Sequence, residues 1–502
     1  MAREREPDYD GVLDDEEEEQ LVGEAGWVEA LQDQFGAVPW WIISAVVHIV
    51  IIALMSLIMV SAPQLESTKV AIPMEVAEDP PELEEIVERD VFTADRNVDV
   101  ANNVEHPVVI HEEVEEFDHM ESENNMNNNT ARGQEDAISD IPCGGTGVVG
   151  NLGVGGGGAG AYGFRGGGGR KRAALAGGGS KKSETAVDRA LEWLWRHQES
   201  AGHWEGERRF EGDDPGKNTD AGVTGLAVLA FLGAGHTEKT GLEKYQKTVR
   251  KAVAWLIKHQ DKQGAIGEGF EGGLGYHHAI AGLALAEAYG MAKVPKTGKA
   301  AQKAIDYSLN VHQSEYSGWR YKPKTPADVS VTGWFVMQLK SGKIAGLKVD
   351  GKGFQGATTF IDKCTKDGGL VSYQPGRSAT PTMTAVGLLC RQFMGWKRDN
   401  PVLKTGADYL MDSLPDWEGG NVNFYYWYYG TLVMFQMGGQ WWKAWNACLR
   451  DMLIERQRSG APKVDGSWDP VGSWCGSGGR VFATASSCLC LEVYYRYLPL
   501  YK

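Results

Sequence analysis

The feature that most constrains the fold is a glutamine, glycine and tryptophan motif that follows an amphipathic helix. The helix is predicted from apolar residues that recur every three or four positions between residues 187 and 195. Directly after it the chain reads Gln198-x-x-x-Gly202-x-Trp204. The glutamine amide can cap carbonyls that lack an intrahelical partner, the glycine permits a tight return, and the tryptophan is a large side chain to bury. The motif therefore predicts a closed helix–loop unit.

Degenerate copies of this motif follow three later helices. Gln260 precedes Gly264, Gln313 precedes Gly318-Trp319, and Gln457 precedes Gly466-x-Trp468. From residue 185 onward we predict helices in pairs, with about 45 to 60 residues between equivalent helices, as an array of helical hairpins requires. The first helices are expected at 185–198, 245–260, 299–312, 355–365, 400–413 and 441–457, and the second at 220–233, 277–290, 328–344, 380–394, 423–437 and 480–496.

The two sets of helices differ in composition. The first helices carry charge on one face, which suits an outer position, whereas the second are rich in small and apolar residues, as in 221–230, which suits burial on both sides. Six hairpins with inner and outer helices close naturally into a ring. We therefore predict an all-α fold, an (α/α)6 toroid over residues 183–502.

The repeated motif resembles that of the squalene cyclase and protein prenyltransferase β-subunit superfamily over about residues 185–502. In that superfamily the glutamine and tryptophan positions are structural and tie the outer helices together. The resemblance implies a stabilising role, and no catalytic one, for the motif residues of this chain, which are Gln198, Gly202, Trp204, Gln260, Gly264, Gln313, Trp319, Gln457 and Trp468.

The reactive motifs of related toroids are incomplete here. Class II terpene cyclases have D-x-D-D-T, whose middle acid protonates an alkene or epoxide, but this chain reads Asp328-Val-Ser-Val-Thr332. Protein prenyltransferases bind zinc through D-x-C and a later histidine, and Ser330 replaces that cysteine. Complement-like thioester domains need C-G-E-Q, whereas Cys475 opens C-G-S-G. We expect no metal and no cofactor, and we lean towards a protein that is not an enzyme.

In such toroids the N-terminal ends of the inner helices surround the active cavity, where unpaired amides favour anions. Some residues at these helix ends also have a structural alternative, because Asp328 can be a helix N-cap, and His277 and His278 can be hydrogen-bonded core side chains. The six aromatic residues 424–429 cannot all be buried on one face, so some are expected to line the cavity or a groove. The cavity candidates are Asp328, Asp220, His277, His278, Tyr426 and Arg480.

The sequence before the toroid predicts a membrane anchor. The segment 38–62 contains about 20 residues without Asp, Glu, Lys or Arg, enough to cross the ~30 Å hydrocarbon layer. We predict a single transmembrane helix, with a cytoplasmic N-terminus because the preceding tail is short, and an extracytoplasmic toroid. Residues 1–37 are an acidic tail, 63–143 an acidic extended linker, and 144–182 a glycine-rich linker with a basic patch at its end.

Two polar residues within the predicted span share a helical face. Ser44 and His48 are four residues apart, and ionisable residues inside a membrane are candidates for function. This face resembles the membrane anchor of TonB-type energy transducers, which implies contact with a proton-driven channel complex. The alternative is a neutral histidine at a helix interface.

The net charge limits the kinds of partner we expect, and the cysteine content limits the metal and disulfide chemistry. The net charge of −17 argues against nucleic acid as the main partner. The seven cysteines have no metal-like spacing, so buried thiols with room for one disulfide are expected. The preferred hypothesis is a membrane-anchored binding or scaffold module for a hydrophobic or glycan ligand. The alternatives are an enzyme acting on an isoprenoid or other lipid, a glycan-active enzyme with Asp220 and Asp328 as its acid pair, and a TonB-like partner of a proton-driven complex.

Overall fold

The computed structural model describes residues 48–49, 162–210, 212–418 and 422–497. The predicted acidic tail, the linker 63–143 and the transmembrane span, apart from His48 and Ile49, lie outside these residues. Among the described helices, none combines the length and the apolar character that crossing a bilayer requires. The helices discussed below all belong to the second of two compact units of the chain, residues 113–502.

Six helices of the described domain form a closed inner ring. Each contacts the next along the chain, and the last, α15, returns to the first, α5. Every residue of α5 after Asp220 is buried, as is every residue of α13, so these helices pack on all sides, as their small and apolar residues predict. The inner helices are α5 (Asp220–Gly233), α7 (Leu274–Ala292), α9 (Val329–Ile344), α11 (Pro381–Phe393), α13 (Phe424–Met437) and α15 (Cys475–Leu491).

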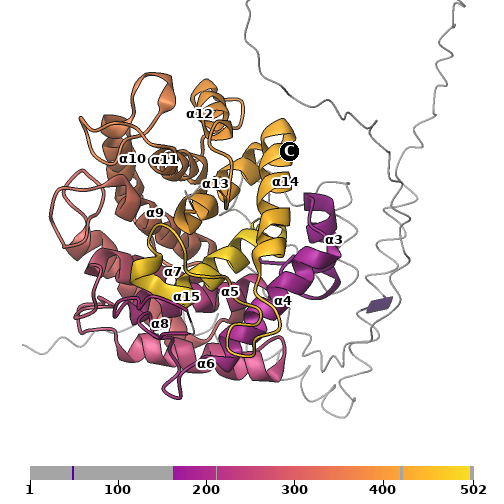
Figure 1. Ribbon diagram of the computed structural model, residues 1–502. Coiled ribbons are helices and arrows are strands. Elements are labelled where there is room, and N and C mark those ends of the chain that lie inside the picture. The colour runs from indigo at the N-terminus through magenta and orange to yellow at the C-terminus, as the bar shows by residue number, and fades with distance from the viewer. Residues whose placement is uncertain (1–47, 50–161, 211, 419–421, 498–502) are drawn as a thin grey trace, which may run out of the picture. The chain divides into compact units, whose positions relative to one another are not determined.

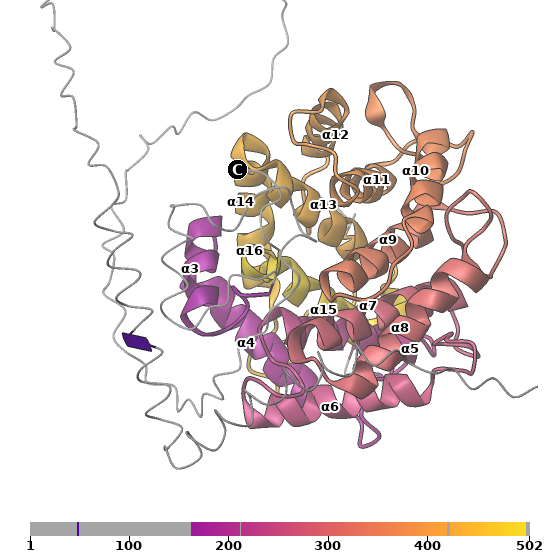
Figure 2. The same cartoon turned by 180° about the vertical axis from the view of Figure 1, so that it is seen from behind.

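An outer layer of helices surrounds this ring, as Figures 1 and 2 show from opposite sides. Each outer helix buries one face, and in α4 that face includes Val187, Leu191 and Leu194. The outer helices are α4 (Lys181–Arg196), α6 (Glu243–Lys258), α8 (Pro295–Tyr307), α10 (Lys352–Cys364), α12 (Pro401–Met411) and α14 (Gly439–Arg456). Within the described residues the predicted all-α, (α/α)6 toroid is therefore confirmed.

The motif glutamines join neighbouring outer helices. The Gln198 amide donates to the carbonyl of Gly202 in its own loop (2.9 Å) and to that of Thr248 in α6 (2.9 Å). The buried Trp204 indole donates to the Leu194 carbonyl at the end of α4 (2.8 Å). The other glutamines repeat this pattern: Gln260 bonds Gly264 and Ala300, Gln313 bonds Ser317 and Gly353, and Gln457 bonds Gly466 and Ala186.

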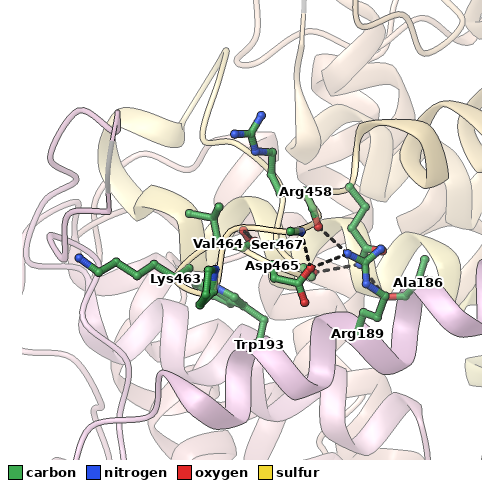
Figure 3. Close-up of polar contacts among 12 residues, drawn as sticks. Ala186, Arg189, Trp193, Arg458, Lys463, Val464, Asp465 and Ser467 are labelled. Atoms are coloured by element: carbon green, nitrogen blue, oxygen red, sulfur yellow. Dashed lines mark hydrogen bonds and ion pairs between the residues drawn. The ribbon is translucent and has the colours of Figure 1, made fainter.

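Figure 3 shows the seam where the last repeat meets the first. Gln457 reaches Ala186 of α4, and Arg189 of the same helix donates back to the Gln457 side-chain oxygen (3.1 Å). Arg189 also pairs with Asp465 (3.0 Å), and the Trp193 indole donates to a carbonyl of the same loop (2.9 Å). The ring is closed by side chains that lie more than 260 residues apart in the sequence.

The structure differs from the predicted linker 144–182 over its last part. Residues 167–177 form a helix, α3 (Gly167–Gly177), and α4 begins at Lys181, four residues before the predicted start at 185. Two side chains ahead of α3, Tyr162 and Arg165, are buried against the ring. In the predicted basic patch, Arg170 is paired with Glu184 (2.7 Å). The folded domain therefore starts inside the glycine-rich segment, because these buried side chains hold it on the ring.

The C-terminal part of the chain also departs from its prediction. The last inner helix begins at Cys475, five residues before the expected position 480, and a short helix, α16 (Val493–Arg496), follows it. A π-helical turn, η3 (Ser308–His312), extends α8 towards its motif glutamine. These differences shift helix ends and add two short elements, and they leave the order of the inner and outer helices unchanged.

Candidate functional site

Hydrogen bonds join the N-terminal ends of several inner helices, where the sequence places its candidate residues. His277 of α7 accepts a hydrogen bond from the backbone of Gly222 in α5 (3.0 Å). The Tyr276 hydroxyl at the start of α7 lies 2.8 Å from the Ser330 hydroxyl of α9, which lies 2.8 Å from that of Tyr425 in α13. We call this end of the ring the rim; it comprises the N-terminal ends of the inner helices, which these polar and aromatic contacts connect, and the loops that precede them.

Ser330 is the third residue of Asp328-Val-Ser-Val-Thr332, the position at which the resemblance to terpene cyclases would place a protonating acid. Its hydroxyl is buried and lies between the hydroxyls of Tyr276 and Tyr425. Burial raises the pKa of Tyr425 and raises that of Tyr276 well above its ordinary value, so both phenols are neutral at neutral pH. None of these three hydroxyls is a strong acid.

Asp328 is the N-cap of α9 and is fully buried. Its Oδ1 accepts a hydrogen bond from the Val331 backbone (2.8 Å), while its Oδ2 has no hydrogen-bond partner. The nearest cation is Arg320, whose Nη1 lies 3.7 Å from Oδ2. Burial raises the pKa of Asp328 to about 6, although the Val331 amide, Arg320, the Tyr373 hydroxyl and the Ser330 amide all act in the opposite direction. Capping accounts for only one of its two carboxylate oxygens.

Two tyrosines flank Arg320. Its guanidinium lies 5.0 Å from the ring centre of Tyr321 and 5.6 Å from that of Tyr373, within the range of cation–π contacts. The two phenol oxygens are 2.6 Å apart, which joins the loop before α9 to the loop before α11. All three side chains are half-buried, so this pair of loops reaches the surface.

The two predicted histidines have structural contacts on both ring nitrogens. Nε2 of His277 bonds the Glu271 carbonyl, and burial lowers its pKa. Nδ1 of His278 accepts from the Ile266 backbone (3.2 Å) and Nε2 lies 2.8 Å from the Ser308 hydroxyl, with its pKa lowered to about 3 by burial. In other repeats a threonine hydroxyl accepts from the equivalent backbone position; these are Thr224, Thr332, Thr384 and Thr484. We infer that both histidines are neutral and brace the loops.

Asp220 lies at the start of α5 with partners of its own. Its Oδ1 accepts from the Gly206 backbone (3.0 Å), and its Oδ2 is 3.6 Å from Nε2 of His203. Burial raises the pKa of Asp220. The structure thus gives Asp220 and Asp328 different neighbours, the His203 imidazole and the Arg320 guanidinium respectively.

Arg480 and Tyr426 hold loops in place. Arg480 donates to both carboxylate oxygens of Asp213 (2.8 and 2.6 Å) and to Asp469 (2.7 Å), so its buried charge is fully paired. The Tyr426 hydroxyl donates to the Ser413 carbonyl after α12 (2.8 Å). The whole aromatic run 424–429 is buried, which corrects the expectation that some of these residues could lie in a surface groove.

Sequence reasoning missed the exposed aromatic residue at the rim. Trp474 is 53 % exposed, and its backbone has a left-handed φ of 70°, a strained conformation for a bulky residue. Its ring lies 6.3 Å from that of Tyr425. Arg320 and Tyr321 were also missed, although they directly follow the motif residue Trp319 and so could have been found from it.

The described residues include neither a metal-ligand cluster nor a disulfide. No group of three or more His, Cys, Asp or Glu side chains is placed there to hold a metal ion. The six cysteines of this part of the chain, at positions 364, 390, 448, 475, 488 and 490, are free thiols, and all except Cys448 are buried.

Comparison with known proteins gives a likeness of limited extent. No protein-family model and no curated protein matches the chain. Among solved structures, the GH76A α-1,6-mannanase of Salegentibacter sp. HEL1_6 is 12 % identical with a TM-score of 0.45, covering 62 % of this chain and 99 % of its own. The type II terpene cyclase MstE from Scytonema is 15 % identical with a TM-score of 0.42, covering 63 % and 99 %. The closed inner ring, with the glutamine hydrogen bonds that join neighbouring outer helices, itself gives the domain its (α/α)6 toroid architecture.

Proposed function

We propose that the chain is a membrane-anchored binding or scaffold module whose toroid binds a ligand at the rim without transforming it. The observation that carries this proposal is the environment of Ser330. Protonating an alkene or epoxide needs a strong, correctly placed acid. A serine hydroxyl bonded to two neutral tyrosines, Tyr276 and Tyr425, does not provide one, and it also lacks the thiolate that a prenyltransferase zinc needs.

The membrane part of the proposal rests on the apolar segment 38–62. We propose a single span with a cytoplasmic N-terminus and an extracytoplasmic toroid, joined by the long acidic linker. Ser44 and His48 would form the face that contacts a proton-channel complex. In that case His48→Ala abolishes crosslinking to the channel partner while the chain stays in the membrane fraction, and crosslinking that persists counts against this contact.

Turnover by the full-length chain in detergent tests the binding proposal. The protein is incubated separately with squalene, with oxidosqualene, and with geranylgeranyl diphosphate plus a thiol peptide as acceptor. The products are identified by mass spectrometry. We expect each compound to be recovered unchanged. Formation of a cyclised or transferred product by the wild-type chain, and its loss in Asp328→Asn, would overturn the proposal.

A second candidate function, an enzyme with Asp328 as general acid, is favoured by one observation. The pKa of Asp328 is raised to about 6, close to the range in which a carboxylic acid donates a proton efficiently near neutral pH. Its substrate would be a glycan or an isoprenoid lipid. This enzyme predicts hydrolysis of at least one polysaccharide, or conversion of one prenyl compound, that Asp328→Asn abolishes; a full panel without such activity excludes it.

A further inference from the structure

We propose that Asp328 and Arg320 form a binding site for an uncharged hydroxyl group of a ligand, with the rim tyrosines against its carbon skeleton. This inference rests on the proposed binding function and names the chemistry of its ligand. The hydroxyl belongs either to a sugar or to an isoprenoid alcohol, which offer the same group on different skeletons.

The first argument is a buried pair of polar atoms without hydrogen bonds. Oδ2 of Asp328 and Nη1 of Arg320 both lie away from solvent and form an ion pair at 3.7 Å, but this distance is too long for a hydrogen bond, and neither atom has one elsewhere. Most buried polar side-chain atoms in native proteins have a hydrogen bond, so an acceptor and a donor that lie side by side without one call for an explanation. A ligand atom that bonds both would supply it.

The second argument is the chemistry that such an atom must have. An ionised carboxylate only accepts hydrogen bonds and a guanidinium only donates them, whereas a hydroxyl does both. One hydroxyl oxygen at about 2.8 Å from each atom can bridge a gap of this width. A phosphate or diphosphate would be repelled by Asp328, and an ammonium group would be repelled by Arg320. The pair therefore selects a neutral alcohol.

The third argument is the aromatic surroundings. Tyr321 and Tyr373 face the Arg320 guanidinium, and the ring of Tyr276 lies 5.6 Å from that of Tyr321. These rings are half-buried, so they can offer both an apolar face and a polar edge to a ligand. Trp474, exposed and strained, continues the aromatic surface beyond Tyr425. The C–H faces of a sugar ring or the chain of a prenyl alcohol both suit such a wall.

The fourth argument concerns access to Asp328. The backbone of Arg320 is fixed, since His312 donates to its carbonyl (2.7 Å) and Gly275 packs so closely on that carbonyl that a Cβ there would collide with it. The side chain of Arg320 is a quarter exposed, unlike that of Asp328. The Arg320 side chain therefore extends from the buried carboxylate to the surface, while its backbone is held in place.

Titration of the full-length chain in detergent tests the inference. The probes are mannotriose, geranylgeraniol and, as the charged comparison, geranylgeranyl diphosphate, followed by calorimetry and by tryptophan fluorescence. We expect one of the two neutral probes to bind saturably, at least tenfold more weakly to Asp328→Asn, which keeps a capping oxygen, and to Arg320→Gln. Asn400→Asp, the matched change at the N-cap of the outer helix α12, should leave that affinity unchanged.

The outcomes separate the possibilities. Binding of mannotriose that both rim variants weaken identifies a sugar, and the same result with geranylgeraniol identifies a lipid alcohol. Preference for the diphosphate, tightened by Asp328→Asn, overturns the inference but leaves a binding module. Affinity for a neutral probe that is equal in the wild type and both folded rim variants overturns it as well, as does the absence of binding by either neutral probe. The proposed lack of turnover is measured separately with the compounds named above.

Discussion

Replacing Gln457 by alanine should loosen the seam that closes the ring. Gln457 is 7 % exposed and its amide donates to the carbonyls of Ala186 in α4 (2.8 Å) and Gly466 in its own loop (2.9 Å). The substitution removes both donors and leaves two carbonyls inside the protein without them. It also removes the oxygen to which Arg189 donates (3.1 Å).

The magnitude follows from these lost bonds. A hydrogen bond contributes a net ~0.5–1.5 kcal/mol, and an acceptor left unpaired by its partner's removal costs about 1–3 kcal/mol. The Ala186 carbonyl lies within α4 and keeps its helical donor, so it loses only the net value of one bond, whereas the Gly466 carbonyl loses the donor from Gln457. We therefore expect the free energy of unfolding to fall by roughly 2–4 kcal/mol. The Gln457→Glu side chain has the same shape but no amide donor, and it should destabilise the chain at least as much.

Thermal and urea unfolding of the full-length variants measure this loss. Hydrogen exchange adds a local readout, because amides of α4 near Ala186 should exchange faster when the seam opens. Gln355→Ala, at an exposed position of α10, is the control and should change stability by less than about 0.5 kcal/mol. If Gln457→Ala and Gln355→Ala are equally stable, the Gln457 hydrogen bonds do not hold the ring closed, and the expected loss of stability is refuted.

Three further predictions concern buried charges. Burial raises the pKa of Glu492 to about 8, so wild-type stability should fall as pH rises from about 4.5 through 8, and Glu492→Gln should remove that fall in melting curves at pH 5–9; parallel curves would contradict it. Glu287 pairs with two buried arginines, so Glu287→Gln should lower the free energy of unfolding in urea by roughly 3–5 kcal/mol, and Arg165→Ala should lower it by less. A larger loss for Arg165→Ala would refute the role of Glu287 as the shared partner of both arginines. Arg480→Lys should lower the free energy of unfolding by about 1–3 kcal/mol, since lysine cannot bond both carboxylate oxygens of Asp213 as the guanidinium does. An unchanged melting temperature would argue against a stabilising role for this two-point contact.

The architecture could be predicted because its determinants are local and repeated. Gln198, Gly202 and Trp204 lie within seven residues, and the hydrogen bonds from Gln198 and Trp204 involve the same loop, the helix just ended and the next outer helix. Composition alone then separates inner from outer helices. The same locality explains why the inner and outer helices of the repeats differed from the prediction only at their ends.

The start of the domain could not be predicted from the sequence. Arg165 lies in a glycine-rich stretch without periodicity, and its partners Glu287 and Arg496 are 122 and 331 residues away. Its guanidinium donates to the Glu287 carboxylate (2.7 Å) and to the Arg496 carbonyl (2.9 Å). Only the closed ring brings these groups together, so nothing in the glycine-rich sequence indicated that Arg165 would be buried.

The rim shows which features of the candidate site could be predicted from the sequence and which could not. Asp328 was identified from its motif position, and the structure adds that only one of its oxygens is used for capping. His278 stood out as a titratable residue, yet it takes the bracing position that threonine has in other repeats. Arg320 and Tyr373 meet across two repeats, and no pattern within one repeat reveals that contact.

Recovery of a bound ligand decides most directly whether the ring binds a molecule without transforming it. The full-length chain is saturated with mannotriose or geranylgeraniol, held until equilibrium, denatured, and the ligand is quantified by mass spectrometry beside Asp328→Asn. We predict that the wild type retains one of the two probes, that Asp328→Asn retains little, and that all of it returns with its mass unchanged. A product of altered mass that forms with the wild type and is absent with Asp328→Asn would contradict the binding function and establish Asp328 as a catalytic acid.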